Sequence, residues 1–204
     1  MPVSTRTTFR TAGVAVRAML VFTLVLGVGY TLLITGIGQL ALPWQANGST
    51  VQNTAGETIG SALIGQSFTD ADGNALPEYF QSRPSAAGDG YDGGASSGCN
   101  WGPENADLVS AIEERQAAIA ELEDVDPSEI PADAVTASAS GLDPHISPAY
   151  ALLQVPRVAA TRGLDESDVR ALVEAHIQQR DLGYLGQPRV NVVELNLALD
   201  ALGS

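Results

Sequence analysis

The chain has 204 residues, of which 24 are acidic and 10 are arginine, with no lysine, so its formal net charge is −14. Because affinity for nucleic acid rests on basic residues that neutralise phosphates, this charge disfavours nucleic-acid binding. Cys99 is the only cysteine, which excludes a disulfide within the chain and leaves a thiol that is either free or buried. The fold must therefore be held together by core packing.

An apolar stretch of 25 uncharged residues, 18–42, is rich in Leu, Val, Ile and Thr. As a helix it would extend roughly 37 Å, which exceeds the hydrocarbon thickness of about 30 Å. A single stretch in lipid satisfies its backbone hydrogen bonds only as a helix, so we predict a transmembrane helix. A cleaved signal peptide is the alternative, although its apolar core usually has about 7 to 15 residues, followed by a small-x-small cleavage site.

Basic residues predict the orientation of this span. Three arginines precede it, and none follows it until position 83; they are Arg6, Arg10 and Arg17. Because positive flanks stay in the cytoplasm, we expect residues 1–17 to be a basic cytoplasmic terminus and residues 45–204 to be an extracytoplasmic domain. Trp44 lies where an interfacial aromatic anchor is expected. We expect a single crossing of the plasma membrane.

Small residues recur within the span, and four glycines are candidate partner contacts: Gly27, Gly29, Gly36 and Gly38. In lipid, small residues allow another helix to approach closely, so one face of the span would pack on a partner. Glycine is also more frequent in membrane helices than in soluble ones, and this simpler interpretation stays open.

The part of the chain after the span is long enough for one compact domain. It holds all 24 acids and seven of the arginines, which gives it a formal charge of −17. A negative field would raise the local cation concentration, although a solvated acidic surface that aids solubility is the simpler interpretation. We expect an α+β fold, in which one mixed α/β domain follows the single transmembrane helix.

The first half of this domain is predicted to be mostly irregular. Residues 61–68 fit a short strand or an extended segment, and residues 79–84 fit a packed loop in which Pro84 keeps Arg83 extended. Glycine, serine and aspartate dominate residues 85–103, and this composition favours a loop.

A first helix is predicted over residues 105–123, with Asn105 as its N-cap. Four apolar residues recur there at nearly helical spacing: Leu108, Ile112, Ile119 and Leu122. Residues 130–148 contain prolines and small residues without a helical period. We expect an extended, turned segment there rather than a helix.

Further helices and a strand are predicted towards the C-terminus. Ser147 and Pro148 form a strong helix start, and Pro156 must kink or shorten the helix that continues to Gly163. A second helix starts at a capping Asp165, with Asp168 in place of the usual capping-box glutamate, and is closed by Gly183. Its apolar face would carry Val169, Leu172, Val173, His176 and Ile177. Residues 189–200 fit a short strand followed by a terminal helix.

No pattern of residues predicts catalysis or metal binding. The Gly-x-Ser-x-Gly elbow of serine hydrolases is absent, although Ser138 and Ser140 are close to His145 in sequence. Two histidines with one cysteine make a poor zinc set, and the aspartates lack EF-hand spacing. His176 fits a packed helix face, and His145 fits either a turn tied to backbone or a partner contact. The glycine-rich loop lacks the lysine of a phosphate-binding loop.

Several strings of residues, in order along nearly the whole chain, resemble the C subunit of the Kdp-type potassium-transporting ATPase, the KdpC family. They are LIGQ at 63–66 with Phe68, YFQSRPS at 79–85, GP at 102–103, VTAS at 135–138, SGLDPHISP at 140–148, QVPRVA at 154–159, PRVNV at 188–192 and LNLALD at 195–200. The basic N-terminus and the single span match the family as well.

This resemblance implies a non-catalytic accessory subunit of an ATP-driven, high-affinity potassium import complex. Its partners would be an ATP-hydrolysing subunit, a potassium-channel-like subunit and membrane lipid, with ATP and K⁺ bound at the level of the complex. The residues that we select as partner contacts, besides the four glycines, are Tyr79, Arg83, Asp143, His145, Asn191 and Asn196.

The family is described as a catalytic chaperone that raises the ATP affinity of the hydrolysing subunit through a Ser-Gly-Gly-type loop. The corresponding residues here are Ser96, Ser97 and Gly98, which depart from that pattern, and the predicted topology puts them on the side away from cytoplasmic ATP. We therefore expect a mechanical role near the ion entrance. A membrane-anchored extracytoplasmic hydrolase and an envelope binding module are the alternatives.

Overall fold

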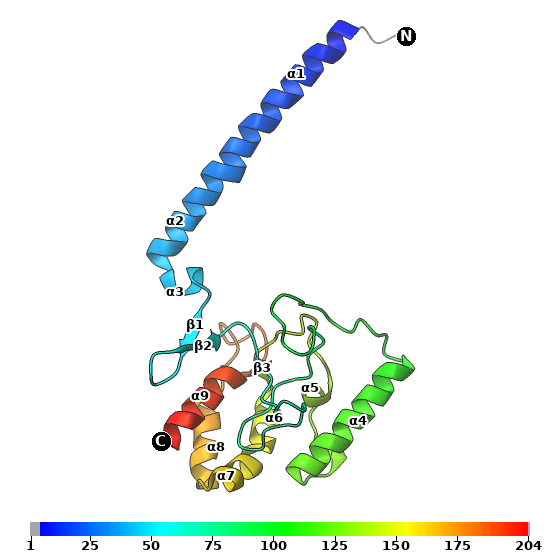
Figure 1. The fold of residues 1–204 in the computed structure, drawn as a ribbon, viewed down its shortest axis with the longest axis vertical. Coiled ribbons are helices and arrows are strands. Elements are labelled where there is room, and N and C mark those ends of the chain that lie inside the picture. Colours follow the sequence, from blue (N-terminus) through cyan, green and yellow to red (C-terminus); the bar gives the residue numbers. More distant parts are fainter. Residues whose placement is uncertain (1–4, 204) are drawn as a thin grey trace. The chain divides into compact units, whose positions relative to one another are not determined.

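The computed structural model describes residues 5–203 of the chain and divides into two compact units, Met1–Ser49 and Thr50–Ser204. The first unit is helical, and the second is a mixed domain of helices and short strands (Figure 1). A long apolar N-terminal helix and a mixed α/β domain confirm the expected α+β class. The further division at residues 17, 42 and 45 stays a prediction.

The first unit contains one continuous helical rod. It consists of α1 (Thr5–Phe22), a π-helical stretch η1 (Thr23–Tyr30) and α2 (Thr31–Ala41), and the backbone at each junction is right-handed helical. The part from Thr8 to Ala41 is long and apolar enough to cross a bilayer. Its 34 residues span about 51 Å at the helical rise, so the helix extends beyond the hydrocarbon core.

The rod ends at Leu42, whose backbone leaves the helical region with φ −136° and ψ 54°. The next residue is Pro43, and a proline disfavours the helical conformation of the residue before it. Pro43 then occupies the first position of the short helix α3 (Pro43–Ala46), which contains Trp44. A proline is tolerated at this position because its missing N–H has no partner within the helix.

The second unit has two small antiparallel sheets and several helices. Strands β1 (Thr50–Gln52) and β2 (Thr58–Ser61) form a hairpin, and β3 (His145–Ile146) pairs with β4 (Val190–Asn191). The helical elements are α4 (Ala106–Glu123), η2 (Pro127–Glu129), α5 (Ala132–Val135), α6 (Pro148–Leu153), α7 (Val155–Arg162), α8 (Glu166–Ala175) and α9 (Val192–Leu202).

The core lies where α6, α7, α8 and α9 meet β3 and β4. Its fully buried side chains include Val155, Val158, Val169, Val173 and Leu195. Figure 1 shows α8 and α9 together on one side of the domain and α4 on the other, with α6 and α7 between them. Phe80, from the long irregular segment, is also fully buried in this core.

The segment around Phe80 is held by side-chain amides rather than by a neighbouring strand. The Phe80 N–H donates to Asn196 Oδ1 (2.9 Å), and Asn196 Nδ2 donates to the Phe80 carbonyl (3.0 Å). Gln154 repeats this arrangement one residue later, since its Oε1 accepts from Gln81 N (2.6 Å) and its Nε2 donates to Gln81 O (3.2 Å). We call this arrangement the amide clamp: Asn196 and Gln154 bind the backbone of Phe80 and Gln81.

Arg157 supports the clamp from α7. Its guanidinium donates to Gln154 Oε1 (2.8 Å), to the Tyr79 carbonyl (3.0 Å) and to both carboxylate oxygens of Glu123 (3.0 Å each). Burial raises the pKa of Glu123, although the hydrogen bonds and charge of Arg157 act in the opposite direction. This buried pair ties the C-terminal end of α4 to α7.

Several predicted helix boundaries are confirmed. Helix α4 begins after Asn105, whose side chain accepts from Asp107 N and Leu108 N, and α6 begins after Ser147, which caps Tyr150 N. Pro156 interrupts the following helix as expected, so that α6 ends at Leu153 and α7 starts at Val155. Asn191 caps α9 directly after the short strand β4.

One predicted boundary is wrong, and one short helix was not predicted. The helix that starts after Asp165 ends at Ala175 rather than at Gly183, because the backbone of Gln178 pairs with Arg189 instead of continuing the helix. The 130–148 segment contains the short helix α5, which was not expected. The carboxylate of Asp133 in this helix accepts from the backbone N–H and the hydroxyl of Ser147, which fixes the start of α6.

The clamp predicts a large loss of stability for Asn196→Leu, which keeps the side-chain volume but removes both partners of Phe80. Two buried backbone groups would lose their hydrogen bonds, each at about 1–3 kcal/mol, so we expect the free energy of unfolding to fall by about 2–6 kcal/mol. Denaturant titration of the full chain in detergent measures this change. The exposed Gln179→Ala variant is the control, and a loss in Asn196→Leu no larger than in the control would contradict the clamp.

Candidate functional site

Three of the residues that the sequence selected as partner contacts form one cluster. Arg83 Nη1 lies 3.1 Å from Asp143 Oδ2, and the other carboxylate oxygen of Asp143 lies 3.1 Å from His145 Nδ1. The three side chains are each between one fifth and one third exposed. Although Arg83 is 60 residues away in sequence, the fold brings it to the turn that leads into β3.

Backbone contacts fix the geometry of this cluster. The Arg83 guanidinium also donates to the Thr136 carbonyl (3.2 Å from Nη2), and the His145 N–H donates to Asp143 Oδ1 (3.0 Å). Burial of Asp143 would raise its carboxyl pKa, but the hydrogen bonds from His145 and the charge of Arg83 outweigh it, and the pKa is lowered. The cluster is therefore a partly exposed, ionised pair with an adjacent histidine.

Tyr91 packs beneath the cluster. Its hydroxyl donates to the Arg83 carbonyl (2.8 Å), and its N–H donates to Ser85 Oγ (2.9 Å). Burial raises the pKa of Tyr91 to about 12. A Cβ added at Gly65 would lie 2.4 Å from the Tyr91 ring, so this close approach requires glycine.

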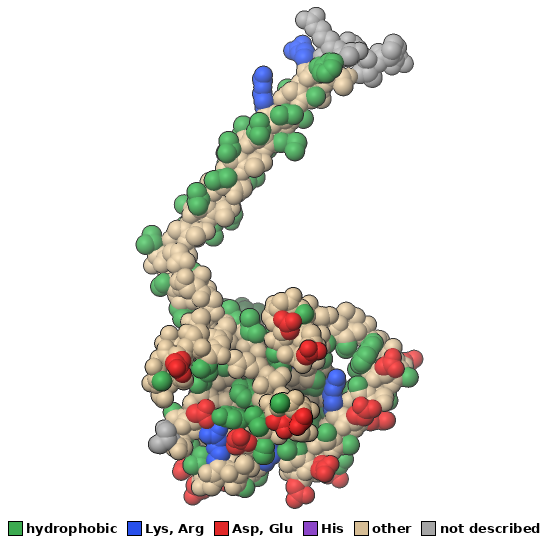
Figure 2. Space-filling model, in the orientation of Figure 1, with side chains coloured by type: hydrophobic (Ala, Val, Ile, Leu, Met, Phe, Trp, Pro, Cys, Tyr) green, Lys and Arg blue, Asp and Glu red, His purple; other side chains and the backbone are tan. Residues whose placement is uncertain are grey.

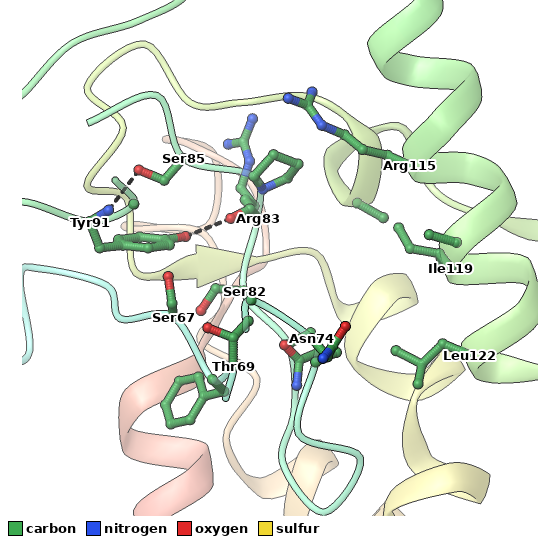
Figure 3. A pocket seen from close by; sticks show the side chains of 18 of the residues that line it. Ser67, Thr69, Asn74, Ser82, Arg83, Ser85, Tyr91, Arg115, Ile119 and Leu122 are labelled. Carbon is green, nitrogen blue, oxygen red and sulfur yellow. Dashed lines mark hydrogen bonds between the residues drawn. The ribbon is translucent and has the colours of Figure 1, made fainter. Parts of the chain in front are cut away.

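A cleft of about 910 Å³ lies beside this cluster (Figure 3). Arg115, Ile119 and Leu122 of α4 form one wall, and polar side chains of the 67–91 segment face them. These polar side chains include Ser67, Thr69, Asn74, Ser82 and Ser85. Arg115 is anchored by a hydrogen bond from its Nη1 to the Val135 carbonyl (3.0 Å). The sequence did not reveal this cleft, because its walls come from segments that no local pattern connects.

The glycine- and serine-rich loop packs against residues 138–141. The Ser97 N–H donates to the Ser140 carbonyl (3.0 Å), and the Ser96 hydroxyl donates to the same oxygen (2.9 Å). Gly141 has φ +68°, and a Cβ there would lie 2.6 Å from the Ser97 carbonyl oxygen. The Ser96 hydroxyl and the Ser97 N–H are thus used within the domain, and the Ser97 hydroxyl donates to the Gly98 carbonyl (3.3 Å), so these groups do not form a phosphate cradle.

Comparison with known proteins gives a consistent result. A family model described as KdpC, the K⁺-transporting ATPase c chain, matches residues 12–201. The chain belongs to the KdpC family.

Individual relatives match the chain over most of its length, and each carries the name potassium-transporting ATPase KdpC subunit. The protein from Caulobacter vibrioides strain NA1000 is 55% identical over 188 residues, which cover 92% of this chain and 91% of the relative. The protein from Beijerinckia indica is 51% identical, with 90% of each chain covered, and that from Herpetosiphon aurantiacus is 51% identical, with 98% of each covered. The resemblance that the sequence suggested is therefore confirmed.

The other contacts selected for this KdpC-family chain have different environments. Tyr79 is half-buried, with its ring 4.7 Å from the Arg162 guanidinium and 5.5 Å from the Phe68 ring. Asn191 and Asn196 are only 3% and 2% exposed. Asn191 caps α9 and donates to the Ala62 carbonyl (2.8 Å), so both asparagines hold the domain together.

The four glycines of the span lie along the rod, Gly27 and Gly29 in η1 and Gly36 and Gly38 in α2. The first three are exposed, and an added Cβ at Gly36 would meet no atom within 4 Å. These glycine positions are thus open to another helix. Whether a partner uses it stays a prediction.

The residues considered for metal binding or hydrolysis in this KdpC-family chain have the following environments between residues 5 and 203. Within it, no group of three or more Cys, His, Asp or Glu side chains is placed to hold a metal ion. The Ser138 hydroxyl lies 3.5 Å from that of Ser140, and His145 Nδ1 is directed at Asp143. His176 follows α8 as its C-cap and places Nδ1 2.8 Å from the Leu172 carbonyl oxygen.

Sequence reasoning missed the importance of Gln154 and Arg157. The signal was present, since Gln154 is a polar residue between apolar ones in a helix that Pro156 interrupts. A fully buried glutamine must find hydrogen-bond partners, and here they come from an extended segment 73 residues earlier.

The lowered pKa of Asp143 predicts how the cluster responds to pH. Because the folded-state pKa lies below the ordinary value of 3.8, the carboxylate stabilises the fold above that value, and this contribution is lost as pH falls through the folded-state pKa. Asp143→Asn should therefore lower the free energy of unfolding by about 1 kcal/mol or less at pH 7, since the pair is partly exposed. The difference from the unmodified chain should shrink towards pH 3. Denaturant titrations across this range measure it, with exposed Asp89→Asn as the control, and a difference that grows on acidification would contradict it.

Proposed function

We propose that this chain is a non-catalytic accessory subunit of an ATP-driven potassium import complex. The observation that supports this most strongly is the KdpC family match across residues 12–201, which covers both the apolar helix and the mixed domain. The relatives are named as subunits of a potassium-transporting ATPase. In this proposal other subunits hydrolyse ATP and conduct potassium, and this chain supports their assembly and coupling.

The N-terminal helix anchors the chain once in the plasma membrane, with its N-terminus in the cytoplasm. Arg10 and Arg17 flank the uncharged part of the helix on one side, and no basic residue follows it before Arg83. This asymmetry favours retention of the N-terminal flank in the cytoplasm. The mixed domain then lies outside the cytoplasm.

Contacts with the other subunits involve two surfaces in this proposal. The glycines of the span admit a helix of a multi-span subunit. In the domain, the cluster of Arg83, Asp143 and His145 offers a fixed donor and acceptor pair at a partly exposed position. A charged pair held by backbone contacts keeps its geometry when a partner binds, which favours specific docking.

Acidic side chains are spread over the visible face of the domain in Figure 2, with few arginines among them. A domain with this charge raises the concentration of cations near its surface within about 8 to 10 Å at physiological salt. Placed near the ion entrance of the complex, it would favour potassium over anions. The field does not distinguish potassium from sodium, so selectivity belongs to the conducting subunit.

A direct role of this chain in ATP binding has weaker support. The family description as a catalytic chaperone points to the loop of Ser96, Ser97 and Gly98. However, the Ser96 hydroxyl and the Ser97 N–H donate to the Ser140 carbonyl, and the Ser97 hydroxyl donates to the Gly98 carbonyl. At the start of α4, the Asn105 side chain accepts hydrogen bonds from the N–H groups of Asp107 and Leu108, so these groups are not available to a phosphate. We therefore favour an effect on ATP affinity that is transmitted through contacts between subunits.

A self-standing envelope binding module is the second candidate function. The cleft beside α4, at about 910 Å³, lies in the size range of small-molecule sites and combines polar and apolar walls. This alternative requires neither a partner subunit nor ATP. A lone, ligand-binding monomer after purification would favour it.

Copurification tests the accessory role. The tagged full chain should retain multi-span subunits after mild detergent extraction, and mass spectrometry identifies them. A variant that ends at Ser49 keeps the helix but lacks the domain, and we expect it to abolish growth at limiting potassium. Immunoblotting of the tag controls for its expression, and normal potassium uptake by the truncated variant would contradict a role for the domain.

Labelling of the single cysteine, the exposed Cys99, tests the orientation of the chain. A membrane-impermeant maleimide should label Cys99 in intact spheroplasts. In a Cys99→Ser background, Thr8→Cys should be labelled only after lysis. The reverse pattern would overturn the topology while leaving the family assignment unaffected.

A further inference from the structure

A hairpin of the domain exposes large apolar side chains to solvent. All nine residues 179–187 are exposed, and three of them are large and apolar: Leu182, Tyr184 and Leu185, at 81%, 69% and 48% exposure. We call residues 179–187 the apolar arm. Single exposed apolar side chains are ordinary, but three within four residues at the end of a projection are typical of an interaction site.

The apolar arm has a defined conformation. Its base is the backbone pair of Gln178 and Arg189 (2.8 and 3.0 Å), which leads directly into the buried strand β4. Further along, Asp181 and Leu185 exchange two backbone hydrogen bonds of 2.9 Å. The three apolar side chains are thus presented by a hairpin that the core supports.

Leu182 has a backbone conformation that leucine rarely adopts. Both Leu182 (φ 54°) and Gly183 (φ 82°) have positive φ, at the centre of a turn closed by the Tyr184 N–H and the Asp181 carbonyl (3.3 Å). Turns with two positive φ angles strongly favour Asn-Gly, whereas a leucine is strained there. Because Leu182 is 81% exposed, it buries little apolar surface that could offset this strain, which points to a role in binding.

The charges around the arm indicate which kind of surface it binds. Arg180 and Arg189 flank the apolar residues, with Asp181 as the only acid between positions 178 and 189. Asp181 forms a long, exposed ion pair with Arg189 (3.9 Å), and Arg180 is exposed. With Arg189 at the base of the arm included, residues 180–189 carry a formal charge of +1, in a part of the chain whose formal charge is −17. Leucines and a tyrosine between arginines match the boundary of a bilayer, where rings lie at the headgroup level and guanidinium groups meet lipid phosphates.

The linker to the N-terminal helix is short. Eight residues, 42–49, separate the end of α2 from the first residue of the domain, and eight residues extend at most about 29 Å. A bilayer that holds the helix therefore stays within reach of the domain on whichever side of the membrane the domain lies. This step rests on the anchored helix of the proposed function but not on its orientation.

We propose that the apolar arm is a second membrane contact, in which Leu182, Tyr184 and Leu185 enter the interface of a bilayer and Arg180 and Arg189 pair with anionic lipid headgroups. The contact fixes how the domain is presented to its membrane-embedded partners. It differs from the span because it is peripheral and reversible.

Fluorescence quenching by lipid tests this contact in the full chain, reconstituted alone into nanodiscs. In a Cys99→Ser background, Gln187→Cys places an environment-sensitive dye beside the three apolar side chains and keeps all of them. Ala71→Cys, in an exposed acidic turn, is the matched control. With lipids that carry a nitroxide near the headgroup, we expect a blue shift and severalfold quenching at position 187 but not at 71.

The same measurement with altered side chains and lipids separates the outcomes. Adding Leu182→Asp and Leu185→Asp to the Gln187→Cys chain should abolish the quenching, and replacing anionic lipid by phosphatidylcholine should reduce it. Equal quenching at 187 and 71 would overturn the proposal. So would a blue shift at 187 that appears only when the other subunits are added, because the arm would then contact protein. Copurification of the complex reports on the proposed function separately from either result.

Discussion

The extended segment around Phe80 is the point on which the rest of the domain depends. It passes through the core without a partner strand, and buried backbone groups cannot remain without hydrogen bonds. Asn196 from α9 and Gln154 from the junction of α6 and α7 supply these bonds, each binding both the N–H and the carbonyl of one residue. The clamp therefore fixes the positions of three helices relative to this segment.

The candidate site is a consequence of this arrangement. Arg83 follows the clamped residues by only two positions, so its direction is set by the same contacts that bury Phe80. Arg157 and Glu123 then attach α4, and α4 supplies one wall of the cleft. A buried charge pair contributes little net stability, but breaking it is costly, so it serves to keep these elements in one arrangement. The positions of the surface groups thus derive from buried polar contacts.

Local chemistry made part of this structure predictable. The caps Asn105, Ser147 and Asp165 and the break at Pro156 act on neighbouring residues, and the helices begin where they predicted. The end of α8 was wrong because a backbone pairing between Gln178 and Arg189 overrides helical periodicity, and helix α5 was missed because it is a single turn in a proline-rich stretch. The cluster of Arg83 and Asp143 was selected through family resemblance, since no local pattern connects residues so far apart. The clamp and the cleft were invisible for the same reason.

The distance in sequence between the two halves of the clamp also sets the timing of folding. Phe80 and Asn196 are 116 residues apart, so the contact has a high sequence separation and cannot form until α9 has been synthesised. At ribosomal rates of about 5–20 residues per second, Phe80 waits roughly 6 to 23 s for its partner. During that interval the core lacks the side chains of α9, which include Leu195 and Leu199. Folding of the domain is therefore completed only as its last helix leaves the ribosome.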